Sequence, residues 1–190
     1  MVQSGKLQSK MRAYDAQVRL IDCTQEEHSA AILSILNEVI ANSTALYDYA
    51  LRTPESMDTW FATKRREGFP IIGIVDAQGI LLAFASWGTF RSFPAYKYTV
   101  EHSLYVHHEH RGRGLGRMLL EELIRRAQQA QLHVMVGCID ASNAVSIHLH
   151  TQFGFIHAGT FEEVGFKFGN WLDAAYYQLN LNTPFAPKDG

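Results

Sequence analysis

The sequence predicts an α/β protein in which a single mixed sheet carries helices on both faces. Its apolar residues switch between the period of two that is typical of strands and the period near 3.6 that is typical of helices. Along the chain these patterns give one strand, two helices, three strands, a helix, a strand, a helix and two strands. The 190 residues, 47% of them hydrophobic, contain no internal repeat and no linker, so we expect one domain with a sizeable core.

The first part of the domain is predicted to contain a strand and two helices. Residues 18–21 have a strand pattern, and Thr24 and Glu27 have the spacing of a capping box. The helix that this box starts has an apolar face made of Ala31, Ile32, Ile35, Leu36, Val39 and Ile40. A loop over residues 42–49 follows, and Pro54 fits the first turn of the second helix.

Three strands come next, and the third is the central strand of the predicted sheet. Residues 71–75 and 80–86 are joined by a turn at 76–79, which predicts a hairpin. A longer connection occupies residues 87–96. Residues 98–106 are rich in β-branched and aromatic side chains and predict the central strand.

The last part of the domain is predicted to alternate between strand and helix before a final hairpin. Residues 133–139 predict a strand, and residues 140–151 predict a helix that begins with polar residues. Two closing strands, 157–165 and 174–181, enclose a turn around residues 168–171. We therefore divide the chain into a flexible N-terminal extension (1–17), a domain (18–181) and a C-terminal tail (182–190).

The overall charge and the cysteines limit the classes of function. A net charge of −2 gives no global basic field, so we expect neither a nucleic-acid partner nor binding to an anionic membrane. Two cysteines cannot make a disulfide framework, and they fit a reducing compartment. Cys138 lies in an apolar strand pattern, where we expect a buried small side chain. The sequence has neither a membrane-spanning stretch nor a signal peptide pattern, so a cytoplasmic location is expected.

A glycine-rich loop joins the central strand to the next helix. Residues 111–116 read Arg-Gly-Arg-Gly-Leu-Gly, and the helix repeats apolar residues at Leu115, Leu119, Leu123 and Ala127. Glycines let a ligand approach the backbone, and the amides at a helix N-terminus favour an anion. Arg111, Arg113 and Arg117 add positive charge, so the loop predicts a diphosphate site. A tight turn without a ligand is the alternative, and the spacing matches neither a Walker A loop nor a dinucleotide fingerprint.

The pattern Arg111-x-x-Gly114-x-Gly116 after a strand resembles the acetyl-CoA loop of the GNAT N-acetyltransferases. Residues 99–106, Thr-Val-Glu-His-Ser-Leu-Tyr-Val, narrow the resemblance to the phosphinothricin and methionine sulfoximine acetyltransferase branch. The similarity covers residues 18–181. It implies the GNAT fold, with a mixed and mostly antiparallel sheet, acetyl-CoA as the cosubstrate and a homodimer as the assembly.

The resemblance also implies which residues bind acetyl-CoA. The backbone of Leu104, Tyr105 and Val106 would hold the pantetheine arm and polarise the thioester carbonyl. The diphosphate would lie on the loop made of Arg111, Gly112, Arg113, Gly114, Leu115, Gly116 and Arg117. Asn143 would contact the cofactor arm, although this residue equally fits the N-cap of a helix.

Acetyl transfer from a thioester to an amine requires a base, a donor for the developing oxyanion and an acid for the departing thiolate. Glu101 on the central strand is the predicted base, and a solvated strand glutamate is the alternative. Strand alternation places Glu101, Ser103 and Tyr105 on one face and Val100, His102, Leu104 and Val106 on the other. His150 takes the position where many GNAT enzymes carry a tyrosine acid, and its imidazolium could protonate the thiolate. A structural histidine fits the same position.

In the family, the acceptor contacts the loop before the central strand and the start of that strand. The predicted acceptor-binding residues are therefore Arg91, Ser92, Phe93, Tyr96, Glu101, His102 and Ser103. An arginine pairs well with a substrate carboxylate through two parallel hydrogen bonds, and a surface arginine is the alternative for Arg91. Tyr47 and Tyr49 lie in a loop that the family places beside the acceptor pocket, where they could touch substrate or serve as packing residues.

The predicted reaction is transfer of an acetyl group from acetyl-CoA to the α-amine of a small amino acid or analogue. Methionine sulfoximine, methionine sulfone and phosphinothricin-like compounds are the expected acceptors. The alternatives are acetylation of a protein or peptide N-terminus and a non-catalytic CoA-binding sensor. No metal is expected, because the reaction needs none and no distant ligand pattern completes His107, His108, Glu109 and His110. Trp60, Trp87 and Trp171 are expected in the core or a pocket wall rather than on a nucleic-acid surface.

Overall fold

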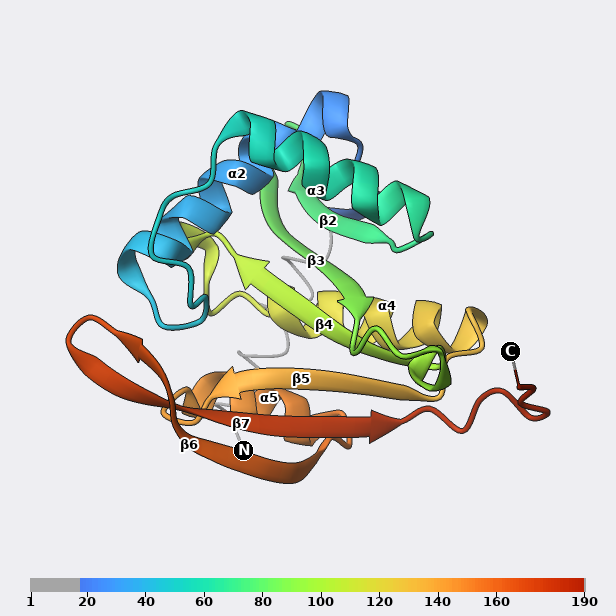
Figure 1. The fold of residues 1–190 in the computed structure, drawn as a ribbon. Helices are drawn as coiled ribbons and strands as arrows, with labels where there is room; N and C mark the ends of the chain where they lie inside the picture. The colour runs from blue at the N-terminus through green and yellow to red at the C-terminus, as the bar shows by residue number, and fades with distance from the viewer. Residues whose placement is uncertain (1–17, 190) are drawn as a thin grey trace, which may run out of the picture.

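A computed structural model describes residues 18–189 of the chain. They form a seven-stranded sheet in the order β1-β2-β3-β4-β5-β7-β6 (Figure 1). Only β4 and β5 pair in parallel, and the other neighbours are antiparallel. The predicted mixed and mostly antiparallel sheet is therefore confirmed. The extension predicted over residues 1–17 lies outside the described residues.

The helices and strands follow the predicted order. The strands are β1 (Val18–Asp22), β2 (Ile71–Asp76), β3 (Leu81–Thr89), β4 (Thr99–Val106), β5 (Val134–Asp140), β6 (Ile156–Lys167) and β7 (Asn170–Asn180). The α-helices are α2 (Gln25–Asn42), α3 (Pro54–Arg66), α4 (Leu115–Gln129) and α5 (Ala144–Gln152). Two short 3₁₀ turns, η1 (Pro94–Tyr96) and η2 (His108–His110), flank β4.

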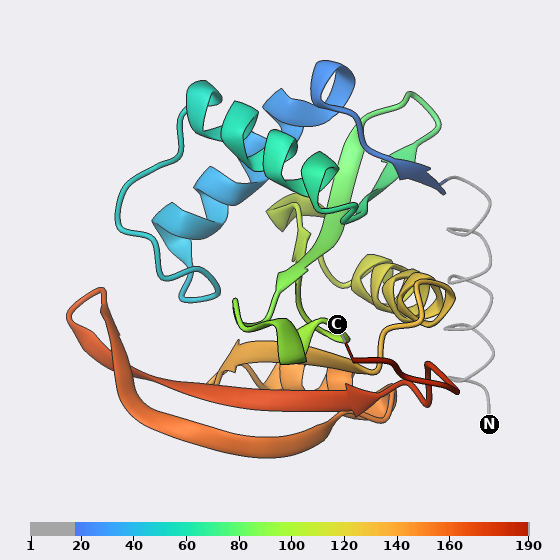
Figure 2. The same cartoon turned by 45° about the vertical axis from the view of Figure 1, so that its right-hand side comes forward.

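Helices cover both faces of the sheet, as the sequence predicts (Figure 2). On one face, α2 and α3 pack on a core that includes Ile35, Phe61 and Phe84. On the other face, α4 packs through Leu119 and Leu123 on a second core. Side chains along β2 and β3 divide between these two cores with the period of two expected for a strand, except at an irregularity where the neighbours Leu82 and Ala83 both belong to the second core.

The predicted helix starts are present at both helices of the first core. The Thr24 hydroxyl accepts a hydrogen bond from the amide of Glu27 at 3.3 Å. The predicted capping box is only half formed, because the Thr24 amide donates to Nδ1 of His28 at 3.1 Å and not to the Glu27 side chain. At α3, Thr53 and Ser56 cap each other reciprocally, and Pro54 occupies the first turn. These caps satisfy amides that would otherwise lack partners at the helix N-termini.

Three strands extend more than one residue beyond their predicted ends. The strand β3 continues to Thr89 because Trp87 is buried and pairs opposite His102. The strands β6 and β7 run on to Lys167 and Asn170, so the closing hairpin is much longer than the pattern indicates. Exposed aromatic residues at its tip weaken the alternation of apolar and polar residues that the prediction relied on.

The sheet opens at its centre. The pairing of β4 with β5 is confined to residues Thr99–Glu101 on β4 and to 134–136 on β5, after which the strands diverge (Figure 1). Beyond Glu101, the edge of β4 that faces β5 is therefore open to a ligand. Residues 102–106 stay paired with β3 on their other edge, so β4 remains rigid where it is open.

Residues 181–189, the described part of the chain after β7, form no helix or strand but contact the body of the domain. The Nδ1 atom of His133 lies 2.7 Å from the carbonyl oxygen of Thr183. The Lys188 amide donates to the Tyr98 hydroxyl at 3.2 Å. None of the described helices combines the length and apolar character needed to cross a membrane.

Candidate active site

A cavity of about 250 Å³ occupies the opening between β4 and β5. The predicted site residues that line this cavity come from β4 and from α5 with its N-cap: Glu101, His102, Ser103, Leu104, Tyr105, Asn143 and His150. Because the edge of β4 is unpaired there, neighbouring residues from both of its faces, such as His102 and Ser103, line this cavity.

The alternation predicted for β4 is confirmed by the two cores. Tyr105 packs beside the core under α2, with its ring 5.5 Å from that of Phe84, while Leu104 and Val106 pack against the core under α4. Burial raises the pKa of Tyr105 to about 12, so its phenol stays neutral. With its side chain held in the core, Tyr105 offers a ligand its backbone.

Glu101 is a half-buried carboxyl group in the cavity wall. Burial raises its pKa, and the positive charge of Arg91 opposes this shift. A carboxylate whose pKa is raised toward neutrality is a better proton acceptor than an ordinary surface glutamate. This environment differs from the solvated strand glutamate that was the alternative.

His102 and His150 form a buried imidazole pair, with exposed fractions of 8% and 3%. Their Nε2 atoms are 3.1 Å apart, and the rings stack with centroids 5.0 Å apart. The Nδ1 atom of His150 lies 2.7 Å from the carbonyl oxygen of Ser146. Because a carbonyl only accepts, this nitrogen carries the hydrogen, and His102 must donate its Nε2 hydrogen to the bare Nε2 of His150.

The environment keeps both imidazoles neutral. Burial lowers the pKa of His102 to about 3, with a further contribution from His150. Burial also lowers the pKa of His150, against the opposing effect of the Ser146 carbonyl. Gly137 leaves room for the pair, because a Cβ atom there would lie 3.1 Å from Nε2 of His102 and 3.3 Å from Nε2 of His150.

Asn143 caps α5, so its predicted structural role is present. Its side-chain oxygen accepts a hydrogen bond from the Ser146 amide at 3.0 Å. Asn143 also lines the cavity, and the cap uses only Oδ1. The two predicted roles are compatible, since the side-chain NH₂ group can serve a ligand.

The glycine-rich loop has the backbone that an anion site needs. Gly112 and Gly114 have φ angles of +75° and +81°, a left-handed conformation that favours glycine. Gly114 is the N-cap of α4, whose first residue is Leu115. Gly116 lies inside the helix, with Leu104 and Leu149 in ordinary contact distance of the position of a Cβ atom.

The three arginines of the loop are held by different partners. Arg111 donates to Glu38 on α2 at 3.0 Å, and Arg113 lies 2.8 Å from Nδ1 of His110. Arg117 donates to Gln152 on α5 at 3.2 Å. Arg113, Gly114 and Arg117 line a second hollow along α4. These residues fit a diphosphate: the amides of a helix N-terminus and cationic side chains meet beside the open edge of β4.

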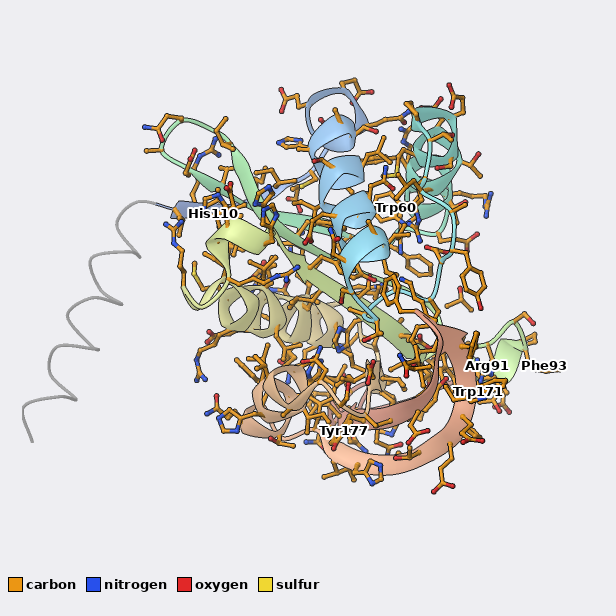
Figure 3. All side chains as sticks on the ribbon, turned by 90° about the vertical axis from the view of Figure 1, so that its left-hand side faces the viewer. Trp60, Arg91, Phe93, His110, Trp171 and Tyr177 are labelled. Atoms are coloured by element: carbon orange, nitrogen blue, oxygen red, sulfur yellow. The ribbon has the colours of Figure 1, made fainter. Side chains whose placement is uncertain are left out.

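Four predicted acceptor residues do not reach the central cavity. Arg91, Ser92, Phe93 and Tyr96 line a separate hollow beside η1. Figure 3 shows Arg91 and Phe93 on one side of the molecule and His110, next to the glycine-rich loop, on the other. The guanidinium of Arg91 lies over the ring of Phe90 and acts on Glu101 through its charge.

Within residues 18–189, one group has donor atoms close enough to share a metal ion. His107, Glu109 and His110 offer atoms that all lie within 4.8 Å of one another. The Nδ1 atom of His110 already faces Arg113. We keep the prediction that acetyl transfer here uses no metal, since the reaction requires none.

A large part of the cavity wall consists of residues that were not predicted from the sequence. These residues are Thr44, Ala45, Leu46, Gly137, Cys138, Ile139, Asp140 and Ser146, and Tyr47 also reaches the cavity. The expectation of a buried Cys138 is wrong, because the divergence of β4 and β5 exposes it. Trp60 and Trp87 pack in or against the cores as expected, but Trp171 is 61% exposed on the closing hairpin and lines no wall of the cavity.

Residues 36–155 match the model of the Acetyltransferase (GNAT) family. The match covers more than half of the chain, and it contains the open β4 edge, the glycine-rich loop and the imidazole pair. The chain belongs to this family of acetyltransferases. Acetyl-CoA is the cosubstrate of the family.

Three similar proteins define the branch more closely. An L-methionine sulfoximine/L-methionine sulfone acetyltransferase of Pseudomonas aeruginosa is 45% identical over 151 residues, which cover 80% of this chain and 88% of the relative. The structure of a provisionally assigned acetyltransferase of Acinetobacter baylyi has a TM-score of 0.90 at 61% identity and covers 91% of this chain and 97% of its own. The crystal structure of a Sinorhizobium meliloti phosphinothricin acetyltransferase in complex with acetyl-CoA has a TM-score of 0.85 at 31% identity, with 91% and 93% covered.

Proposed function

We propose that this enzyme transfers the acetyl group of acetyl-CoA to the α-amine of a small amino acid analogue of the methionine sulfoximine, methionine sulfone or phosphinothricin type. The observation that carries the proposal is the placement of Glu101, with its raised pKa, in a cavity that opens beside the unpaired edge of β4. The names of the relatives support the acceptor class.

The chain has separate elements for the two substrates. We propose that Gly112, Gly114 and the start of α4 bind the diphosphate, with Arg113 and Arg117 beside it. The open edge of β4 over Leu104, Tyr105 and Val106 would bind the pantetheine arm. When bound, acetyl-CoA supplies an acetyl thioester at the cavity. The small volume of the cavity then favours an acceptor the size of an amino acid.

Glu101 is the proposed base. An amine enters as an ammonium ion and must lose a proton before it can attack a carbonyl carbon. The Glu101 carboxylate accepts this proton directly or through one water. The β4 amides beside it stabilise the negative charge that develops on the thioester oxygen.

His150 as the acid for the departing thiolate stays a prediction. Both hydrogens of the neutral imidazole pair are donated to protein acceptors, and burial opposes the imidazolium form. His150 can therefore act only after it gains a proton. The acceptor nitrogen releases a second proton as the amide forms, and this proton balances the one that the thiolate takes up.

We also propose a homodimer and a cytoplasmic location. Large apolar side chains are exposed along the closing hairpin: Phe161, Val164, Phe166, Phe168 and Trp171. A patch of this kind is typical of a protein interface. Sedimentation of the wild type and of Trp171→Asp at the same concentration tests the dimer. The free thiols of Cys23 and Cys138 fit a reducing compartment.

The decisive experiment measures release of free CoA thiol from acetyl-CoA. The wild type and Glu101→Gln are compared with methionine sulfoximine, methionine sulfone, phosphinothricin, unmodified amino acids and a peptide with a free N-terminus. We expect turnover with the small analogues and a fall in kcat of at least about 100-fold in the variant.

Other outcomes point to the alternatives. Turnover confined to the peptide would replace the small acceptor with a protein N-terminus. Binding of acetyl-CoA without turnover of any amine would indicate a sensor. Turnover that survives in Glu101→Gln would leave the reaction but remove Glu101 as its base.

A further inference from the structure

Asp140 is a buried carboxylate that the reaction described above does not use. It ends β5, lines the same cavity as Glu101, and is 7% exposed. Its Oδ1 atom accepts hydrogen bonds from the amide and the hydroxyl of Ser142, at 2.8 and 2.7 Å. Its Oδ2 atom is also buried but has no hydrogen-bond partner among the described residues.

The two oxygens of Asp140 therefore have different roles. Oδ1 holds the turn between β5 and α5, which is a purely structural task. A buried oxygen without a partner costs roughly 1–3 kcal/mol, so a native structure normally satisfies it with water or a ligand. Because Asp140 lines the cavity, a molecule bound in the cavity can supply the missing donor.

The surroundings keep Asp140 charged. Burial raises its pKa, but the nearby Thr44 hydroxyl and the hydroxyl and amide of Ser142 outweigh burial and lower the pKa below its usual value. The Thr44 hydroxyl exerts this effect from close by, without a hydrogen bond of normal geometry to Oδ2. Thr44 lies on the α2–α3 side of the cavity, as does Tyr47. The negative charge of Asp140 helps to raise the pKa of Tyr47, which shows that the two side chains are close.

Two carboxyl groups in one cavity thus have opposite environments. Burial raises the pKa of Glu101, whereas hydrogen-bond donors lower that of Asp140. When the pKa values of two carboxyl groups are shifted in opposite directions, one group usually transfers protons and the other stabilises charge. Glu101 can exchange a proton during turnover, while Asp140 remains an anion throughout.

We propose that Oδ2 of Asp140 binds an N–H group of the acceptor and fixes the acceptor in the cavity. The inference rests on the proposed function, since it concerns the same acceptor site. Two N–H groups meet the requirement: the α-ammonium, which every acceptor of this class has, and the N–H on sulfur, which methionine sulfoximine has and methionine sulfone lacks. Asp140 is then a substrate-binding residue that helps to select the acceptor.

The test uses Asp140→Asn, which keeps an acceptor oxygen for Ser142 and replaces the carboxylate Oδ2 with an NH₂ donor. We expect the acceptor KM to rise about tenfold or more, because a charged hydrogen bond becomes a repulsive contact between donors. The KM for acetyl-CoA should change less than about twofold. Ser142→Ala is the matched control, since it weakens the turn at Oδ1 and leaves Oδ2 unchanged.

Comparison of two acceptors identifies the N–H group. An equal rise in KM for methionine sulfoximine and methionine sulfone assigns the α-ammonium. A rise for the sulfoximine alone assigns the N–H on sulfur. Thermal stabilisation of the CoA-bound enzyme by each acceptor gives a readout without turnover, and it should shrink in Asp140→Asn but not in Ser142→Ala.

Failure of the role of Asp140 and failure of the proposed function give different results. If the wild type turns over the acceptors and Asp140→Asn has the same acceptor KM and the same thermal stabilisation, only the role of Asp140 is overturned. A rise in KM that Ser142→Ala reproduces would assign Asp140 to the turn and also overturn the proposal. If the wild type neither turns over nor is stabilised by any acceptor of the panel, the proposed function itself fails and the inference fails with it.

Discussion

The two halves of the site are built in different ways. The half proposed for acetyl-CoA is almost continuous in sequence, because β4, the glycine-rich loop and the start of α4 lie within residues 99–117. The half proposed for the acceptor combines the α2–α3 loop and the end of β5, which are far apart in the chain, and the closing hairpin contacts that loop (Figure 2). Local backbone conformation therefore shapes the first half, and long-range contacts shape the second.

A buried lysine makes the most important of these long-range contacts. Nζ of Lys167, at the end of β6, donates to the carbonyl oxygens of Ser43 and Leu46 at 2.8 and 2.6 Å. Lys167 is 4% exposed, and burial lowers its pKa. The Tyr49 hydroxyl donates to the Phe166 carbonyl at 2.5 Å and adds a second link. The hairpin thus positions a loop more than 100 residues earlier in the chain.

The largest effect on stability is expected when the link between Lys167 and the α2–α3 loop is removed. Lys167→Met leaves two carbonyl oxygens without their donor, and we expect the free energy of unfolding to fall by about 3 kcal/mol. The acceptor KM should rise more than the KM for acetyl-CoA, because the α2–α3 loop lines the cavity proposed for the acceptor and not the hollow beside the glycine-rich loop. Urea unfolding and steady-state kinetics measure both. The exposed Lys188→Met is the control, and equal changes in the two KM values would contradict the division of the site into halves.

The imidazole pair of His102 and His150, which lies between the two halves of the site, predicts that the protein loses stability in acid. The unfolded chain binds a proton on each histidine below about pH 6.5, whereas the folded chain does not, because burial lowers both pKa values. The free energy of unfolding should fall by up to about 1.4 kcal/mol per pH unit for each histidine as the pH decreases from 6.5 toward the folded pKa. Urea unfolding at pH 7, 6 and 5 measures the slope.

Two variants separate this pair from the other histidines. His102→Gln should flatten the slope, while the exposed His148→Gln should leave it unchanged. If both variants keep the slope of the wild type, another group is responsible for the acid sensitivity.

The glycine-rich loop allows a matched comparison within the cofactor half. Gly114→Ala places a side chain at a φ angle of +81°, and we expect a loss of about 1–2 kcal/mol of stability and a higher KM for acetyl-CoA. Gly116→Ala lies two residues further, inside α4, where alanine favours the helix and a Cβ atom meets Leu149 and Leu104 at 3.4 and 3.5 Å. Its stability should stay equal or rise. A similar loss in both would show that space, not backbone conformation, limits this loop.

The smallest effect is expected at Arg91. Its charge opposes the rise in the pKa of Glu101, so Arg91→Gln should move the acid limb of kcat/KM to higher pH, by less than about one unit for an exposed charge. The acceptor KM should rise at most a few-fold, because Arg91 lies outside the central cavity. Arg66→Gln on α3 serves as the control. A loss of activity as large as that of Glu101→Gln would instead assign direct substrate binding to Arg91.

The difference between local conformation and long-range contacts also explains which features the sequence could predict. Contiguous patterns such as the helix starts at Thr24 and Pro54, the alternation along β4 and the loop around Gly114 report local conformation, and the fold confirms these predictions. Asp140 and Lys167 depend on pairing between distant strands, and nothing in their own neighbourhood marks them. Cys138 was expected to be buried because its neighbours are apolar, but the opening between β4 and β5 is a property of the sheet and not of that segment.

The pairing of only three residues between β4 and β5 also limits how this enzyme can diversify. Side chains alternate along β4, so a one-residue slip would turn Glu101 toward α4 and bring an imidazole to the acceptor side. The register of this short parallel pairing thus fixes which side chains of β4 point to each face of the sheet. An insertion close to it would exchange the side chains on one face with those on the other. Acceptor preference is expected to change instead through the α2–α3 loop and the closing hairpin, whose lengths can vary without shifting the register of β4 and β5.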